Sequence, residues 1–232
     1  MLLPVSTPLL AALTFCSAAF AILGSLSGQQ WLLYLFKPLT TLLILAHAWP
    51  RGRGHAVRRW VLLGLLCSLA GDIALMWPGE NFFIVGLLSF LLAHLSYLWA
   101  FTRVERFFRA WPWSFLFYAL LAGLILSRLW PGVPAELRPP VIAYVACLAA
   151  MGAQAAALWR RQGGAASFVL ALGGLLFVVS DAILATNKFA GPLPRASLWV
   201  LITYWAAQWC IASWLAAPQA WQAQGQASEG KK

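Results

Sequence analysis

The chain has 232 residues, of which 62% are hydrophobic and only 9% are charged, with a formal net charge of +10. Soluble domains carry about 25% charged residues, so this composition excludes a water-soluble fold and indicates a protein that lies mostly in lipid. No basic stretch is long enough or rich enough in aromatic residues to form a nucleic-acid-binding face, so we attribute the positive charge to loops beside anionic lipid headgroups.

Apolar runs separated by Pro, Gly and charged residues predict an all-α, polytopic membrane protein with eight transmembrane helices. A helix of about 20 residues crosses the hydrocarbon core, so eight helices use most of the chain and predict a single domain over residues 1–217. In chain order, the predicted helices cover residues 5–24, 31–49, 60–77, 82–102, 112–129, 139–159, 166–186 and 197–217. The stretch 218–232 is rich in Gln and Ala and predicts a disordered cytoplasmic tail.

The distribution of Lys and Arg among the loops predicts the orientation of the chain. With eight spans, the termini and the second, fourth and sixth loops share one side. That side carries Arg51, Arg53, Arg58, Arg59, Arg103, Arg106, Arg109, Arg160, Arg161, Lys231 and Lys232. The opposite side carries Arg128, Arg138, Lys188 and Arg195. Because basic loops favour the cytoplasm, we expect a multi-pass protein of the cytoplasmic (inner) membrane with both termini in the cytoplasm.

Three ionisable residues lie well inside predicted spans, namely Lys37, Asp72 and Asp181. A charge at the bilayer centre costs ~2.5–3.5 kcal/mol on insertion scales, so such residues usually face the interior of the helix bundle and serve a function. With ~1.5 Å of rise per residue, Lys37 and Asp72 lie about 18 Å from the cytoplasmic ends of their spans, and Asp181 about 22 Å. We therefore expect all three in one layer near the middle of the membrane, where they can line one cavity.

Four further polar side chains fall near the same layer. Tyr204 and Gln208 lie one helical turn apart on the last span, and His94 and Tyr97 share one side of the fourth span. We predict that these four side chains position water or form hydrogen bonds with the two carboxyl groups.

A short internal similarity relates the surroundings of the two acids. Gly71 precedes Asp72 and Ser180 precedes Asp181, and each acid is followed by a turn and a span that bears a Tyr. Small residues beside the acids allow close approach of neighbouring helices. The pattern suggests that the eight helices form two four-helix halves related by a parallel repeat.

Each of these residues also has a purely structural interpretation. The two acids can pair with Lys37 or accept hydrogen bonds that hold helices together, and Lys37 can extend toward the outer interface. His94 can be an ordinary hydrogen-bonded core residue, whereas His47, near the end of its span, is expected at the membrane interface.

The sequence indicates neither a disulfide nor a metal site. No C-x-x-C motif is present, and the cysteines all fall in apolar spans, where they are expected to be small core residues. They are Cys16, Cys67, Cys147 and Cys210. Zinc usually needs three or four His, Cys or carboxylate ligands, and too few of these lie deep enough, so we expect no metal and no other cofactor.

The polar residues belong to an ordered series of motifs. The series begins with Lys37-Pro38-Leu39 and Gly71-Asp72-Ile73-Ala74-Leu75, continues with His94, Tyr97 and Ser180-Asp181-Ala182, and ends with Tyr204-Trp205-Ala206-Ala207-Gln208. No single motif is specific, but the ordered set, over residues 31 to 215, resembles the YhhN family of membrane proteins, whose characterised members are lysoplasmalogenases.

The resemblance implies an eight-span enzyme that requires no metal. Its activity would be hydrolysis of the vinyl ether bond of a lysoplasmalogen, which yields a fatty aldehyde and glycerophosphocholine or glycerophosphoethanolamine. The site residues that the resemblance implies are Lys37, Asp72, His94, Tyr97, Asp181, Tyr204 and Gln208.

The chemistry of vinyl ethers suits a pair of carboxyl groups. Cleavage begins with protonation of the β-carbon, which creates an oxocarbenium ion; water then adds and the hemiacetal collapses. Glycosidases solve a related oxocarbenium problem with two carboxyl groups. Desolvation and mutual repulsion would keep one aspartate protonated while the other stays ionised. We expect Asp72 and Asp181 to be this catalytic pair, and the sequence leaves open which of them is the protonated acid.

Three other functions remain compatible with the sequence. A small-molecule or lipid transporter can use the same intramembrane charges as a proton relay. A structural or lipid-binding membrane protein needs no chemistry at all. A different lipid hydrolase, such as a sphingolipid amidase, would more naturally use a metal cluster. The partners expected in every case are a lipid or small molecule and the bilayer, and no nucleic acid; the oligomeric state is open.

Overall fold

The computed structural model describes residues 7–109 and 112–216, and the predicted tail over 218–232 lies outside the described residues. Within them the chain forms eight α-helices and two short 3-10 helices, η1 and η2, but no strand, which confirms the predicted all-α class. The elements are α1 (Thr7–Ser27), α2 (Gln30–Ala48), α3 (Ala56–Ala74), α4 (Glu80–Thr102), α5 (Pro112–Leu129), η1 (Trp130–Gly132), η2 (Ala135–Leu137), α6 (Arg138–Gln162), α7 (Gly164–Phe189) and α8 (Ala196–Trp214).

The helix α3 differs most clearly from its predicted span. The sequence predicts a helix over 60–77, whereas α3 covers Ala56–Ala74. A span chosen by apolarity leaves out Arg58 and Arg59, but both lie in the first turns of the helix, and Arg58 donates hydrogen bonds to the carbonyl oxygen of Trp49 in the preceding loop. Asp72 consequently lies in the last turn of α3.

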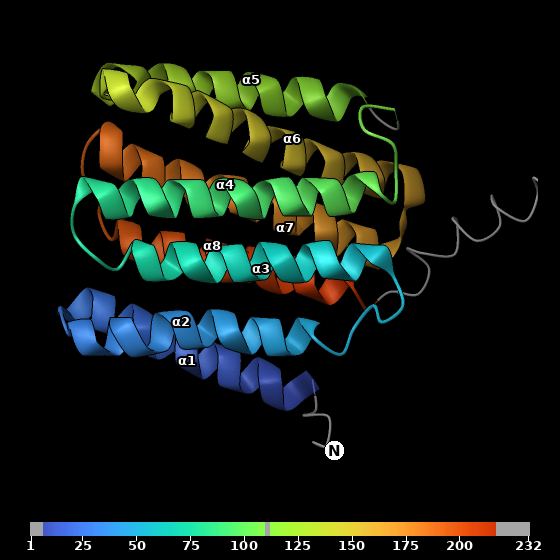
Figure 1. Cartoon of the computed structure of the whole chain (residues 1–232), viewed down its shortest axis with the longest axis horizontal. Helices are drawn as coiled ribbons and strands as arrows, with labels where there is room; N and C mark the ends of the chain where they lie inside the picture. Colours follow the sequence, from blue (N-terminus) through green and yellow to red (C-terminus); the bar gives the residue numbers. More distant parts are fainter. Residues whose placement is uncertain (1–6, 110–111, 217–232) are drawn as a thin grey trace, which may run out of the picture.

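The helices lie side by side with their axes nearly parallel (Figure 1). The pair α1 and α2 forms one edge of the bundle and the pair α5 and α6 the other, with α3, α4, α7 and α8 between them. Most helices adjacent in sequence pack on one another, although α4 and α5 do not pack closely, and contacts of α2 with α8 and of α4 with α6 join segments distant in sequence. The arrangement brings α2, α3, α4, α6, α7 and α8 around a common interior. The expected repeat of two four-helix halves stays a prediction.

The outer surface of the bundle is strongly apolar. Phe15 is 77% exposed and Leu120 is 66% exposed, which is the arrangement expected of side chains that face lipid. Among the described residues, six helical segments are long and apolar enough to cross a membrane, and they contain α1, α2, α4, α5, α6 and α7. The chain is therefore a polytopic α-helical membrane protein.

The two remaining helices lie in the same bundle but are less apolar. The sequence of α3 includes Arg58, Arg59 and Asp72, and that of α8 includes several Trp residues together with Tyr204 and Gln208. These polar and aromatic residues lower the mean hydropathy of α3 and α8. The predicted total of eight spans therefore extends beyond the six segments that composition alone identifies.

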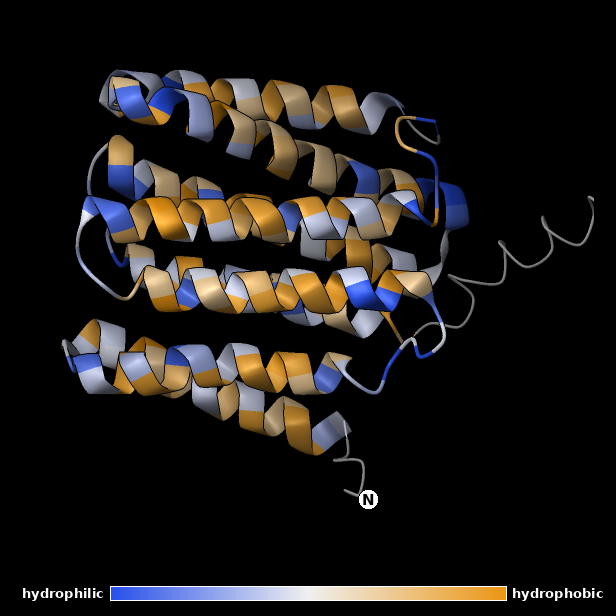
Figure 2. Cartoon of the chain, viewed as in Figure 1, coloured by the Kyte–Doolittle hydropathy of each residue, from blue (hydrophilic) through white to orange (hydrophobic). Residues whose placement is uncertain are grey.

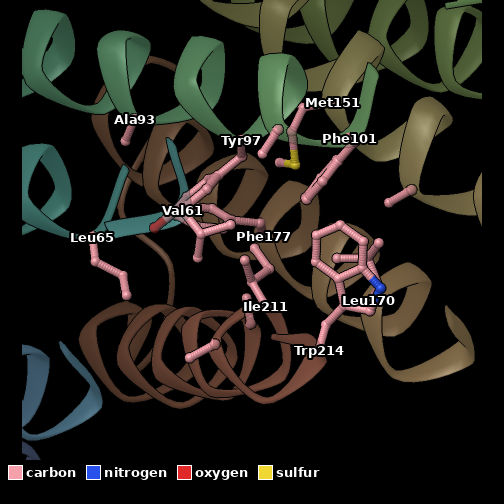
Figure 3. Packing of buried hydrophobic residues seen from close by; sticks show 14 of the residues in the cluster. Val61, Leu65, Ala93, Tyr97, Phe101, Met151, Leu170, Phe177, Ile211 and Trp214 are labelled. Carbon is pink, nitrogen blue, oxygen red and sulfur yellow. The ribbon is translucent and has the colours of Figure 1, made fainter. Parts of the chain in front are cut away.

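The core of the bundle is formed by large aromatic and aliphatic side chains from α3, α4, α6, α7 and α8. Figure 3 shows Tyr97 and Phe101 on α4 close to Phe177 and to Trp214, and all four are buried. The ring of Tyr97 lies against Gly64 of α3, where a Cβ atom would collide with it. Gly64 thus allows α3 and α4 to approach closely enough to place Tyr97 in the interior.

Charge is distributed unequally between the two ends of the bundle. The α2–α3, α4–α5 and α6–α7 loops share one end (Figure 1), and hydrophilic residues gather there in Figure 2. These connections and the adjoining helix turns carry Arg51, Arg53, Arg58, Arg59, Arg103, Arg106, Arg109, Arg160 and Arg161. The opposite end, formed by the other connections, has far fewer basic residues.

Candidate functional site

Both predicted acids line one cavity of about 210 Å³. Asp72 reaches the cavity from α3 and Asp181 from α7, and Lys37 of α2 and Tyr204 of α8 line it as well. Four residues that are distant in sequence are therefore brought to one space, as the sequence predicts.

The cavity extends from the buried acids toward the end of the bundle that has few basic residues. Asp72 is 1% exposed and Asp181 is 9% exposed, whereas Asn187 and Ser197, which also line the cavity, are exposed. Asn187 lies in the last turn of α7 and Ser197 in the first turn of α8. The site is thus displaced toward this end of the bundle, and Asp72 lies in the last turn of α3, which ends at Ala74. The predicted layer near the middle of the membrane stays a prediction.

The carboxyl group of Asp72 is surrounded by hydrogen-bond donors. Thr41 and Tyr204 donate from their hydroxyl groups to Oδ2 at 2.6 Å and 2.7 Å. The ammonium group of Lys37 lies 3.6 Å from Oδ1 and donates to the backbone oxygen of Asp72 at 3.2 Å. Lys37 therefore faces the interior rather than the outer interface, and its charge and the two hydroxyl donors favour the ionised form of Asp72.

A chain of hydrogen bonds leads to Asp72 from deeper in the core. The Tyr97 hydroxyl group donates to Oε1 of Gln208 at 2.6 Å. Nε2 of Gln208 donates to the Tyr204 oxygen at 3.3 Å, and Tyr204 in turn donates to Asp72. Because every donor in this chain points toward the carboxyl group, the chain fixes the orientation of Tyr204 and favours a negative charge on Asp72.

Asp181 has a different set of partners. The Tyr144 hydroxyl group donates to its Oδ2 at 2.6 Å, and Nε2 of His94 lies 3.1 Å from the same oxygen. Nε2 of His94 also lies 3.0 Å from the Tyr144 oxygen. Both partners therefore contact one carboxyl oxygen, and among the described residues Oδ1 has no hydrogen-bond partner.

The surroundings of His94 indicate a neutral imidazole. Its Nδ1 atom is buried and has no hydrogen-bond partner within the described part of the chain. A proton on Nδ1 would be a buried donor without an acceptor, which is costly. We therefore assign the single ring proton to Nε2, where it points toward Asp181 and Tyr144. Asp181 thus has neutral hydrogen-bond donors, whereas Asp72 has the ammonium group of Lys37.

The structure connects all seven predicted site residues to one of the two carboxyl groups, either directly or through the chain described above. It also adds two residues that sequence reasoning missed, Thr41 and Tyr144. Threonines in helices often donate to the backbone of the preceding turn, as Thr40 does, so Thr41 has no distinctive sequence signal. Tyr144 lies close to Arg138 in sequence and resembles an interfacial tyrosine.

Three further predictions concern His47, the cysteines and a metal site. His47 lies in the last turn of α2, near the end of its span as expected, but its side chain is buried in the bundle. It is 2% exposed, stacks on Trp209 and lies 3.1 Å from the hydroxyl group of Ser213. All four cysteines are free, and Cys16 is exposed on the outer face instead of buried in the core. Over residues 7–109 and 112–216, no three His, Cys, Asp or Glu side chains are grouped closely enough to hold a metal ion.

Comparison with known proteins identifies clear relatives. The profile of the YhhN family matches residues 32–215. The human lysoplasmalogenase TMEM86B is 36% identical over 198 residues, which cover 84% of this chain and 80% of that protein. The human lysoplasmalogenase TMEM86A is 31% identical over 80% of this chain and 79% of its own length. The membrane protein YhhN of Escherichia coli is 30% identical over 72% of this chain and 79% of its own length. No solved structure matches the chain.

Proposed function

This chain belongs to the YhhN family, and on that premise we propose that it hydrolyses the vinyl ether bond of lysoplasmalogens. The products are a fatty aldehyde and glycerophosphocholine or glycerophosphoethanolamine. The observation that supports this function most strongly is one intramembrane cavity lined by two carboxyl groups with unlike partners. The relatives named lysoplasmalogenase support the choice of substrate.

In this proposal Asp181 is the general acid. Its partners, His94 and Tyr144, are neutral donors to Oδ2, so Oδ1 is free to carry a proton toward the cavity. Transfer of that proton to the β-carbon of the vinyl ether leaves Asp181 ionised and creates the oxocarbenium ion. The hydrogen bonds from Tyr144 and His94 then stabilise the carboxylate that forms, which lowers the barrier of the slow step.

Asp72 is the ionised partner in the same scheme. Its negative charge, held by Lys37 and two hydroxyl donors, stabilises the oxocarbenium ion across the cavity. Asp72 then accepts a proton from the water molecule that attacks the α-carbon. The hemiacetal collapses with transfer of its hydroxyl proton to the departing glycerol oxygen, which gives the aldehyde and the alcohol, and the proton on Asp72 returns to Asp181 through solvent.

The position of the cavity suits a lysolipid. The vinyl ether of such a lipid lies just below the headgroup, and the cavity likewise runs from buried acids to exposed Asn187 and Ser197 near one end of the bundle. Arg195 directly precedes α8 at this end and is a suitable partner for the phosphate group. The headgroup therefore occupies the mouth of the cavity and the vinyl ether reaches the acids.

The topology completes the proposal. All eight helices cross the membrane, since α3 and α8 lie among the six apolar segments and run parallel to them (Figure 1). The arginine-rich end lies in the cytoplasm. The mouth of the cavity consequently opens on the opposite side, and the substrate enters from the non-cytoplasmic leaflet.

An assay with three lipids tests the proposed function. The protein is purified in detergent and incubated with 1-alkenyl, 1-alkyl and 1-acyl lysophosphatidylcholine, and aldehyde, alcohol and fatty acid are measured. The proposal expects aldehyde from the alkenyl lipid and no product from the other two, because only the alkenyl lipid has a carbon that an acid can protonate. Absence of aldehyde from the alkenyl lipid would contradict the proposal, and a transporter, which needs two compartments, would give that result.

A further inference from the structure

Asp181 borders two small apolar cavities in addition to the polar cavity that it shares with Asp72. One has a volume of about 50 Å³ and lies between α5, α6 and α7, and the other has the same volume and lies mainly between α4, α6 and α7. Tyr144 and Val145 line both of them, as does Asp181. The carboxyl group thus lies where a polar space meets an apolar one.

The first of these inner cavities continues toward the lipid-facing surface. Ala122 of α5 and Val145 and Ala149 of α6 line it, and the same three residues line a groove of about 770 Å³ between α5 and α6. The rest of that groove is formed by apolar side chains from α5, from α6 and from the loop before α5. The inner cavity that Asp181 borders and the outer groove therefore meet at these three side chains.

We propose that this passage between α5, α6 and α7 binds the single hydrocarbon chain of the substrate. The inference rests on the proposed function and deepens it, because it assigns the two parts of one lipid to two spaces that meet at Asp181. The headgroup occupies the polar cavity, the chain occupies the passage, and the vinyl ether bond that joins them lies at the carboxyl group.

The position of α5 suits the entry of a lipid hydrocarbon chain from the surrounding bilayer. It is the least buried of the membrane-crossing segments, and in it only Ser114, Tyr118 and Leu129 are buried. Its packing is chiefly against α6. A small outward movement of α5 widens the inner cavity at Ala122 and Ala149 without disturbing the hydrogen bonds of Asp72 and Asp181, which come from other helices.

A second large groove provides the contrast. The groove between α1 and α8 has a volume of about 830 Å³ and is also apolar, but none of its lining residues belongs to the cavity that holds the acids. Size and apolarity are thus similar in the two grooves, and only the α5–α6 groove shares residues with a cavity that borders Asp181. This continuity is what favours a substrate chain over a structural lipid as its occupant.

Two substitutions test the passage with substrates whose hydrocarbon chains differ in length. Ala122→Phe and Ala149→Phe each place a ring at the junction between the inner cavity and the groove. The control is Ala143→Phe, which introduces the same side chain at an exposed position of α6 that lines none of these cavities. The kcat/KM of each folded variant is measured with hexadecenyl and butenyl lysoplasmalogens.

The expected result is stated as kcat/KM for the hexadecenyl lipid divided by kcat/KM for the butenyl lipid. This ratio should fall about tenfold or more in the junction variants, because the long hydrocarbon chain needs the space that the ring fills. In the control it should stay near the wild-type ratio. An unchanged ratio in both junction variants would overturn the inference. If wild-type protein cleaves neither substrate, the proposed function fails and a binding experiment decides the inference by itself.

The binding experiment uses a non-hydrolysable probe, 1-O-hexadecyl lysophosphatidylcholine with a diazirine at the end of the alkyl chain. We expect photo-labelling of peptides from α5 and α6 that an excess of unlabelled lipid suppresses and that Ala149→Phe reduces. Labelling that is found mainly on α1 and α8, or that unlabelled lipid does not suppress, would contradict the inference whatever the activity of the protein.

Discussion

Asp72 on α3 and Asp181 on α7 line the same cavity, and each is held by a different set of partners. Lys37 gives Asp72 a cationic neighbour at 3.6 Å, whereas Asp181 accepts from Tyr144 and lies beside a neutral His94. In the proposed mechanism these unlike surroundings make one carboxyl group the acid and the other the carboxylate, as in glycosidases, which also form oxocarbenium ions. The predictions below follow from this difference.

The pairing of Lys37 with Asp72 predicts a distinctive pattern of stability. Lys37→Met leaves a buried carboxylate without its cation and Asp72→Asn leaves a buried ammonium group without its anion, so each should lower the stability of the protein by about 3–5 kcal/mol. The double variant removes both charges and should recover most of that loss, but no activity. Thermal unfolding in detergent measures the cycle. Losses that simply add in the double variant would show that the two side chains are not coupled.

Tyr144, which sequence reasoning missed, is predicted to matter for catalysis. Tyr144→Phe removes the hydroxyl group that donates to Asp181 at 2.6 Å and should lower kcat about 10-fold to 100-fold, the range for a hydrogen bond to a group that becomes charged. Tyr34→Phe is the matched control, because Tyr34 contacts Gln30 and Trp77 outside the site. Equal activities of the two variants would remove Tyr144 from the mechanism.

The residues that were and were not predictable differ in a physical way. Lys37, Asp72 and Asp181 stand out because charges are rare in apolar spans, and Tyr204 and Gln208 because one helical turn separates them. Which acid Lys37 contacts depends on α2 packing against α3, and helix neighbours cannot be read from the order of the spans. The arrangement that brings Tyr144 to Asp181 requires α6 to lie beside α4 and α7, which is again a matter of packing.

The predicted helix ends agree with the observed ends to within about three residues, except at the start of α3. The bounds of α5 match the prediction, since Pro112 begins the helix and η1 follows Leu129. The helix α3 includes Arg58 and Arg59, because charged side chains are compatible with helix formation. The predicted span was chosen by apolarity and therefore left these two residues out. Because α3 begins before residue 60 and ends at Ala74, Asp72 lies nearer the C-terminal end of its helix than the predicted span placed it.

The orientation of the chain predicts which end reagents can reach. In a variant without native cysteines, Glu136→Cys probes the α5–α6 connection at the end where the cavity opens, and Arg53→Cys probes the arginine-rich end. Both positions are exposed and neither lines the cavity. A membrane-impermeant maleimide added to intact cells should label Glu136→Cys readily and Arg53→Cys only after permeabilisation. The reverse pattern would place the mouth of the cavity in the cytoplasm.

Protonation at carbon leaves a label in the product. In deuterated water the aldehyde should carry one deuterium on the carbon next to the carbonyl group, because the acid delivers its exchangeable hydrogen to the β-carbon of the vinyl ether. Immediate reduction to the alcohol prevents later exchange, and mass spectrometry locates the deuterium. Unlabelled saturated aldehyde incubated with the protein is the control for exchange. Product without deuterium at that carbon would exclude acid-catalysed cleavage.

The most direct measurement is the rate of aldehyde release by purified Asp181→Asn beside wild-type protein and Glu80→Gln, a control that alters an exposed acid in the first turn of α4. Asparagine keeps the shape of the side chain and its contacts with Tyr144 and His94 but has no acidic proton to deliver. We predict that Asp181→Asn stays folded and loses activity by about 10²-fold to 10⁴-fold, the usual contribution of a general acid, while Glu80→Gln retains it. A folded Asp181→Asn protein that releases aldehyde at the wild-type rate would contradict the role of Asp181 and with it the proposed mechanism.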